Sequence, residues 1–416
     1  MKVIKPQQLG VLTRSYEFRR EFQLGISALA FVPLGTKRAL IPELAMWPVI
    51  SQQMDGSPLL DVGIPKSKAE YLVVGSVHAP HGEPTPQCTV MAEVAGKRKL
   101  LMVTGDREWR TANQAALPSQ PVPFESMPLT WKRAFGGSRY PGNPDGRGYT
   151  PESGPTPDSL LLPNLEYPTQ RVVRSTDTPE PAGYGPVDVS WAPRAARAGT
   201  HDNVWLERDF PGFARDIAWE FFNLAPPDQW FDEPFAHDAP YELYNMHPER
   251  AHMAGALPGL RARCFVQRRG RDQQNFSDME EVSLALTTLW FFPSIERVVM
   301  VFHGSVMTAE DDASDISHLM VAAENASTPI DVEHYRAVTA RRCDREKSHL
   351  YTLKDSELCP AELMERDPVA AAAEADADHE DLARQRQLRR MRTEIDAARA
   401  RGGLGAGPGC TRSPPA

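Results

Sequence analysis

Proline is the feature that most restricts how this chain can fold. The sequence holds 38 prolines in 416 residues, nearly double the usual share of about 5%. They are spread along the whole chain, and proline disrupts helix interiors and central strands because it lacks a backbone N–H. The composition therefore predicts many rigid turns and long ordered loops in place of long regular helices.

Strand patterns are concentrated in two parts of the chain. Apolar or alternating runs predict strands at 22–26, 71–77, 88–94 and 99–104, and later at 261–267, 281–291 and 297–304. No long helical crossover separates the early strands, and a turn near Gly96 joins two of them, so we expect mostly antiparallel sheets. Apolar residues at helical spacing predict two short helices, at 315–326 and 332–342.

Between these parts, from about residue 112 to 255, proline and glycine recur every few residues. Tryptophan and phenylalanine continue through this middle region, whereas a disordered linker would contain few aromatic residues. We therefore predict an α+β, β-rich domain over 1–345, with the middle region 112–255 wrapped on the sheet core. A connecting segment would follow at 346–367 and a charged helical or disordered tail at 368–416.

Charge, cysteine usage and the lack of long apolar runs indicate the cellular compartment and disfavour two classes of partner. The net charge of −9 disfavours binding to nucleic acid, which requires a positive surface. The five cysteines are scattered without a C-x-x-C pair, a pattern typical of a reducing compartment. We see no secretory leader and no apolar run of membrane-spanning length. We expect a cytoplasmic protein with neither nucleic-acid nor membrane partners.

The glycine-rich segment (131–149), WKRAFGGSRYPGNPDGRGY, raises the question of a phosphate-binding loop. It has no Gly-Lys-Ser/Thr, as a P-loop requires, and Gly146 and Gly148 do not lead into a helix, as a dinucleotide-binding loop requires. Asn143, Pro144 and Asp145 before Gly146 instead predict a tight turn. The segment is predicted to be a shaped corner or surface.

Candidate metal ligands and nucleophiles do not occur in any known metal-binding or catalytic pattern. His78 and His81 lie in extended or turn structure, which fixes no common face for a metal. The acidic run 310–315 lacks the pattern of a calcium loop and is predicted to cap the helix after it. Ser305 lies two residues after His303, without a nucleophile elbow. We assign no catalytic residue, metal ligand or cofactor, and we expect no enzyme.

Two other functions remain alternatives. A hydrolase-type enzyme would use His303, His201 or the Asp106/Glu108 pair, and two or three of these would have to meet in a pocket. A carbohydrate- or peptide-binding β-domain would instead line a groove with tryptophan rings.

Four strings in the middle region resemble the signature of a known bacterial family. They are LTWKRAFGGSRYPGNPDGRGY (129–149), LPNLEYP (162–168), PAGYGPVDVSWAPRAARAGTHDNVWLERDFPGF (181–213) and NLAPPDQ (223–229). In this order they are similar to the domain-of-unknown-function 2169 family, and the resemblance extends to about residue 345. It implies a non-enzymatic adaptor, or chaperone, of type VI secretion, whose partners are a PAAR-like effector and the VgrG-type spike protein onto which that effector is loaded.

The positions that match the signature are carried over as partner-binding or scaffold residues. They are Trp131, Arg133, Phe135, Gly136, Gly137, Asn143, Pro144, Gly148, Asn164, Glu166, Gly183, Gly185, Pro186, Trp191, Pro193, Arg194, Gly199, Thr200, Asp202, Trp205, Ala225, Pro226, Asp228 and Gln229. Two positions depart from the family pattern. His201 stands where an aromatic residue is expected, and His303 where an arginine is expected before Gly304. Whether each signature residue is a contact or a core residue stays open, as do the effector and the oligomeric state.

Overall fold

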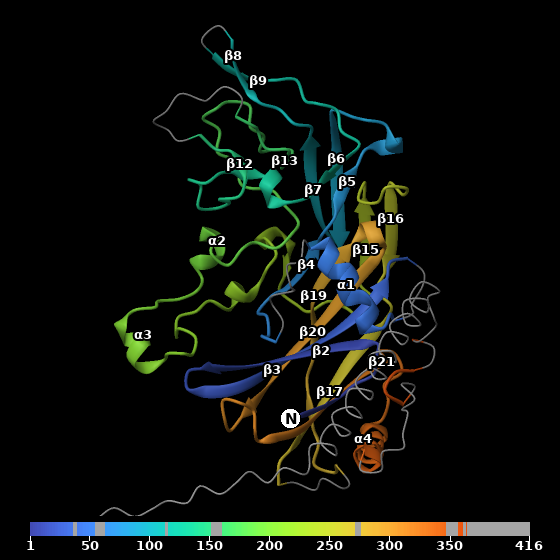
Figure 1. The fold of residues 1–416 in the computed structure, drawn as a ribbon. Coiled ribbons are helices and arrows are strands. Elements are labelled where there is room, and N and C mark those ends of the chain that lie inside the picture. The colour runs from blue at the N-terminus through green and yellow to red at the C-terminus, as the bar shows by residue number, and fades with distance from the viewer. Residues whose placement is uncertain are drawn as a thin grey trace, which may run out of the picture. The chain divides into compact units, whose positions relative to one another are not determined.

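The computed structural model describes residues 1–35, 40–54, 63–112, 115–150, 160–270, 276–346, 357–360 and 363. All of these belong to one compact unit, residues 1–365. The unit is β-rich, with mostly antiparallel sheets and few helices, as the sequence predicts (Figure 1).

The largest sheet has six strands in the order β14-β4-β19-β20-β3-β2. Their bounds are β2 Leu9–Phe18, β3 Glu21–Pro33, β4 Ala69–Val73, β14 Trp230–Phe231, β19 Ala285–Phe292 and β20 Arg297–Thr308. All neighbours are antiparallel except β4 and β19. The central strands β3, β19 and β20 are buried over most of their length, which explains their nearly continuous apolar sequences.

A second, five-stranded antiparallel sheet has the order β13-β7-β6-β15-β16. Its strands are β6 Gln87–Val94, β7 Lys97–Thr104, β13 Leu165–Glu166, β15 Pro240–Tyr244 and β16 His252–Ala256. The predicted hairpin at Gly96 is confirmed. Ala95 and Gly96 both have positive φ, +48° and +81°, as a two-residue hairpin turn between right-twisted strands requires.

A third sheet corrects one prediction. Its four strands, in the order β1-β21-β17-β18, are β1 Lys2–Ile4, β17 Leu260–Arg268, β18 Glu280–Val282 and β21 Ile316–Asn325. The helix predicted at 315–326 is wrong, because this segment is β21, paired along its length with β17. Residues 319–323 are all buried, so the apolar run serves both faces of a strand. The acidic run 310–315 accordingly lies in turns before a strand and caps no helix.

Two longer helices flank the sheets. The helix predicted at 332–342 is confirmed as α4, Val332–Glu346. Helix α1, Glu43–Gln53, is not predicted from the sequence, because Pro48 lies inside it. The remaining elements are short: β5 Ser76–His78, β8 Trp109–Ala112, β9 Ala115–Pro118, β10 Ser126–Pro128, β11 Phe135–Gly136, β12 Arg147–Gly148, α2 Ala192–Ala195 and α3 Asn203–Arg208.

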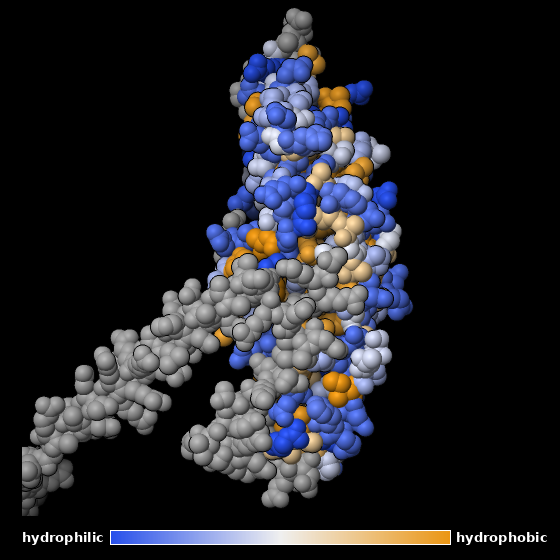
Figure 2. All heavy atoms as spheres, turned by 90° about the vertical axis from the view of Figure 1, so that its right-hand side faces the viewer, coloured by the Kyte–Doolittle hydropathy of each residue, from blue (hydrophilic) through white to orange (hydrophobic). Residues whose placement is uncertain are grey.

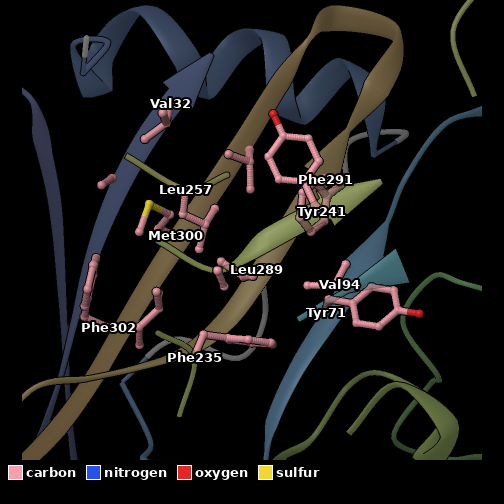
Figure 3. Close-up of a cluster of buried hydrophobic side chains, with 14 of the residues drawn as sticks. Val32, Tyr71, Val94, Phe235, Tyr241, Leu257, Leu289, Phe291, Met300 and Phe302 are labelled. Carbon is pink, nitrogen blue, oxygen red and sulfur yellow. The ribbon is translucent and has the colours of Figure 1, made fainter. Parts of the chain in front are cut away.

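One hydrophobic core extends through all three sheets. Figure 3 shows part of it, with Tyr71 and Phe291 from the six-stranded sheet and Val94 and Tyr241 from the five-stranded sheet. The rings of Tyr241 and Phe291 lie 5.4 Å apart, and the Tyr241 hydroxyl accepts a hydrogen bond from the Gly35 N–H at 2.7 Å. The sheets therefore share one apolar interior.

Candidate functional site

The glycine-rich segment is a compact turn held together by Asn143. This residue is fully buried, and its Nδ2 donates to the backbone oxygens of Trp131 (2.9 Å) and Phe135 (3.0 Å). Its own backbone oxygen accepts from the N–H groups of Gly137 (3.0 Å) and Gly146 (3.2 Å). One residue thus satisfies the backbone on both sides of the turn, and the predicted tight turn is confirmed.

Two signature glycines permit this close packing. A Cβ on Gly136, which has φ +153°, would lie 2.1 Å from the backbone oxygen of Asn143. A Cβ on Gly148, which has φ +94°, would lie 2.6 Å from Cδ of Pro163. Any side chain at either position would force backbone to move, so both glycines are structural requirements.

Asp106 connects the segment to the strand end of β7. Its Oδ1 accepts from Nη1 of Arg133 (3.2 Å), Nη1 of Arg147 (3.3 Å) and Nδ2 of Asn164 (3.0 Å). Asn164 also donates to the backbone oxygen of Thr104 at 2.9 Å. Burial and the neighbouring Arg133 lower the pKa of Arg147, which nonetheless stays charged at neutral pH. The cluster has the character of a structural ion-pair network.

Glu166 is buried within the protein. Its carboxylate accepts from Nη2 of Arg107 at 2.9 Å and from the backbone N–H of Val172 at 2.6 Å. Burial raises the pKa of Glu166, while Arg107 and the Val172 N–H act in the opposite direction. Since strand β13 contains Glu166 and pairs with β7, this signature residue fixes a loop to the five-stranded sheet.

A second signature group surrounds Lys99 on β7. The Nζ of this buried lysine donates to the Gly183 backbone oxygen (2.6 Å), to Asp228 Oδ1 (2.9 Å) and to Gln229 Oε1 (2.8 Å). Three acceptors match the three N–H groups of the ammonium. Burial lowers the pKa of Lys99 to about 8, and Asp228 opposes that shift.

Gln229 extends this network into the six-stranded sheet. Its Nε2 donates to the backbone oxygens of Tyr71 on β4 (2.6 Å) and of Tyr184 (3.1 Å). The Tyr184 hydroxyl in turn donates to the backbone oxygen of Lys99 at 2.8 Å. Lys99 and Gln229 therefore tie two long loops to two different sheets.

Trp131 and Trp191 are brought together by the same loops. Their rings meet edge to face with centroids 5.9 Å apart, and Trp131 Nε1 donates to the Gly185 backbone oxygen at 3.2 Å. A Cβ on Gly183 would lie 3.1 Å from the Trp131 ring, so glycine lets this ring pack flat on the chain. The two tryptophans and two glycines form a single packed unit.

Beside this unit lies a half-open pocket of about 430 Å³, which we call the signature pocket. Four signature residues line it: Trp131, Pro186, Trp191 and Arg194. Its other lining residues are mostly apolar and include Val189, Phe213, Phe221, Phe222, Leu224 and Trp290, together with the charged Arg14, Lys132, Asp145 and Asp188. An apolar, aromatic pocket with few charges suits the side chains of another polypeptide.

Arg194, on α2, holds one wall of the signature pocket. Its guanidinium donates to the backbone oxygens of Val187 (2.7 Å) and Phe221 (2.8 Å from Nη2), and it lies over the Phe221 ring. The residue is only 5% exposed. Arg194 therefore positions the apolar wall, with its donors directed to the protein backbone.

Four further signature residues, Gly199, Thr200, Asp202 and Trp205, belong to an arm, defined as residues 199–216. Asp216 closes it by accepting from the Thr200 N–H (2.9 Å) and hydroxyl (2.7 Å). Asp202 caps α3 by accepting from the Trp205 N–H at 3.0 Å, and Trp205 Nε1 donates to the Gly212 backbone oxygen at 3.0 Å. Figure 1 shows α3 at the left, beside the sheets.

The arm exposes apolar side chains. Phe210 is 62% exposed, Leu206 55% and Val204 53%. The Phe210 ring packs on Trp205, whose other ring neighbour is His201, the position that departs from the family pattern. Large apolar side chains that are exposed close together often mark a site of protein–protein interaction. This surface of the arm is therefore a candidate contact with another protein.

The signature residues described above thus fall into four groups: the turn around Asn143 with Asp106, Glu166 with Arg107, the loops around Lys99 with the pocket, and the arm. Sequence reasoning missed Lys99, whose partners are three loop residues far away in the sequence. It also missed Phe213, Phe221 and Trp290 as pocket residues. Lys99 directly follows Lys97 and Arg98 on β7, so no local signal in the sequence sets it apart from exposed basic residues.

The residues of the hydrolase alternative have separate surroundings. His303 is buried on β20, with Nδ1 2.7 Å from the Thr287 hydroxyl oxygen, whereas His201 lies on the arm. Asp106 pairs with arginines of the glycine-rich segment, and Glu108 accepts from Arg110. Among described residues, no group of three or more His, Cys, Asp or Glu side chains is placed to hold a metal ion. Among the helices of the described residues, none is both long enough and apolar enough to cross a membrane.

Comparison with known proteins assigns the family. A family model described as "Uncharacterized protein conserved in bacteria (DUF2169)" matches residues 19–303. The chain belongs to this family. The match covers most of the six-stranded and all of the five-stranded sheet, the glycine-rich segment, the arm, and every residue of the signature pocket except Arg14. No match was found among curated proteins or among solved structures.

Proposed function

We propose that this DUF2169 protein is a non-enzymatic adaptor that binds a PAAR-like effector and assists its loading onto the type VI secretion spike. The observation that carries the proposal is the construction of the signature pocket. Signature residues from two strings, 129–149 and 181–213, build its aromatic wall. Asp228 and Gln229, from a third string, help to fix the loops to the sheets through Lys99.

Two polar signature residues, and Lys99, which binds three other signature residues, support this proposal through what they bind. Asn143, Lys99 and Arg194 direct their donors at backbone oxygens or at neighbouring side chains of the protein itself. A surface that is preorganised in this way loses little conformational entropy when it binds another chain. The tryptophans beside it are residues that commonly carry binding energy at protein interfaces.

The test is co-expression with a PAAR-like effector from the same gene neighbourhood, followed by purification of the complex. Val189 lines the pocket and is 49% exposed, so Val189→Asp would place a carboxylate in the apolar contact. We expect binding to weaken by about tenfold or more. Val173→Asp is the matched control, because Val173 is 63% exposed and lies outside the pocket.

Purified partners that never associate would refute the adaptor role. A complex that forms equally with both valine variants would instead remove the signature pocket from the contact. Measurement by isothermal titration calorimetry separates these results, and thermal melting of each variant establishes that it is folded.

A further inference from the structure

Strand β16 leaves an open edge on the five-stranded sheet. It pairs with β15 on one side, and no strand pairs with its other side among the described residues. In Figure 1 it lies at the right, and Figure 2 shows that side, where apolar residues are exposed among hydrophilic ones. An open edge presents a row of N–H and C=O groups that another strand can bind.

The register identifies which backbone groups point outward. The N–H groups of Leu257 and Asn245 donate to Ala239 and Ala251, at 3.0 and 2.8 Å, so the odd-numbered residues of β16 face β15. The backbone groups of His252, Ala254 and Ala256 consequently face away from the sheet. The side chains of these three residues are also exposed.

Other sheet edges in the described structure carry features that discourage pairing. Strand β18 has Glu280 and Glu281, and β1 is three residues long with Lys2 in it. On β2 the outer backbone oxygen of Glu17 is already occupied by the Phe213 N–H. Strand β16, HMAGA, contains no Asp, Glu, Lys, Arg or Pro, so its edge lacks these features.

We propose that β16 binds β16 of a second copy of this chain, in antiparallel register about a two-fold axis through Ala254. In that register His252 faces Ala256 of the second copy, and Met253 faces Gly255. A large side chain is opposite a small one in both pairs. His252, Ala254 and Ala256 each donate and accept one interchain hydrogen bond.

A second copy suits this edge better than a charged peptide does. A two-fold axis places identical groups opposite each other, so any charge near the axis would repel its own copy. The segment 252–256 itself has no Asp, Glu, Lys or Arg. The carboxylate nearest to the axis, Glu242 on β15 beside Ala254, lies 3.5 Å from Nε2 of His252. Gly255 is also required within the chain, because a Cβ there would lie 2.6 Å from the Tyr241 hydroxyl oxygen.

The test is the mass of the full chain in solution, measured by size-exclusion chromatography with light scattering. The wild-type protein is expected at twice the chain mass of 46.2 kDa. Ala254→Lys and Ala254→Glu each place like charges at the axis, and each is expected to give the single-chain mass. Mixing the two variants should restore the double mass, because the opposed charges then attract.

Two further variants keep the result interpretable. Ala254→Pro removes the outward N–H and is also expected to be monomeric, since an edge strand tolerates proline at such a position. Thr89→Lys is the control, because it adds the same charge at an exposed position on the interior strand β6 and should leave the dimer intact. A monomeric wild-type protein, or Ala254 variants that remain dimeric, would overturn the proposal. This inference is independent of the adaptor role.

Discussion

At the scale of single residues, buried polar side chains attach the long loops to the sheets. Asn143 lies in a turn with few regular backbone hydrogen bonds, whereas Lys99 lies on β7 and binds residues of two long loops. Each of the two side chains satisfies several groups at once. Each buried acceptor that loses its donor lowers the free energy of unfolding by about 1–3 kcal/mol. Replacing one of these side chains should therefore have a large effect on stability.

Replacing Asn143 by aspartate should destabilise the protein. Asn143→Asp keeps the side-chain shape but removes the Nδ2 donor, and it turns a carboxylate toward the backbone oxygens of Trp131 and Phe135. We expect the free energy of unfolding to fall by about 2–4 kcal/mol. Urea denaturation measures this change.

The control for this variant lies two residues away. Asp145 is exposed in the same turn, and Asp145→Asn should change the free energy of unfolding by about 0.5 kcal/mol or less. Equal effects of both substitutions would show that Asn143 has no special role in holding the turn.

Lys99 predicts a dependence of stability on pH. Burial lowers its pKa from 10.5 to about 8, so between these values the folded state has lost a proton that the unfolded state keeps. Stability rises with pH where the unfolded state binds more protons. Relative to Lys99→Met, the wild-type protein should therefore gain about 1–2 kcal/mol between pH 7 and pH 9.5.

Urea denaturation of both proteins at the two pH values checks this prediction. Arg98→Met, on the same strand, is the control, because arginine stays charged over this range and its difference from wild type should not change with pH. If the difference in unfolding free energy between wild type and Lys99→Met is also the same at both pH values, burial does not lower the pKa of Lys99.

At the scale of elements, local patterns predicted the strands better than the helices. The hairpin of β6 and β7 follows from apolar runs around Gly96, since its pairing is local in sequence. Strand β21 was misassigned because Ile316, Leu319 and Met320 fit a helical period equally well. Its pairing with β17, more than 50 residues earlier at some positions, decides the conformation, and no local window contains that information.

The candidate site shows the same limit. The glycine-rich segment was predicted as a tight turn in a shaped corner because turn chemistry is local, and the Asn143 hydrogen bonds reach no farther than Trp131. The signature pocket joins Arg14, Trp131 and Trp290, which are widely separated in sequence. Its existence could not be derived from spacing, although the family resemblance named four of its residues.

At the scale of the whole molecule, the shared core predicts that residues 1–365 unfold together. The apolar cluster includes Val32 and Phe291 of the six-stranded sheet, Val94 and Tyr241 of the five-stranded sheet, and Val321 of the third sheet. A smaller cluster around Trp109 and Phe135 is joined to it through the β7–β13 pairing.

Chains of this length commonly unfold through intermediates, so cooperative behaviour here would be informative. Since one apolar cluster joins all three sheets, we expect calorimetry to give one transition for this unit, with the calorimetric and van't Hoff enthalpies in agreement. Asn143→Asp should lower that single melting temperature, because the turn it loosens is packed on the common structure. If the variant instead produces an early second transition while the main one is unchanged, the glycine-rich segment folds independently and is not coupled to the core that positions the signature pocket.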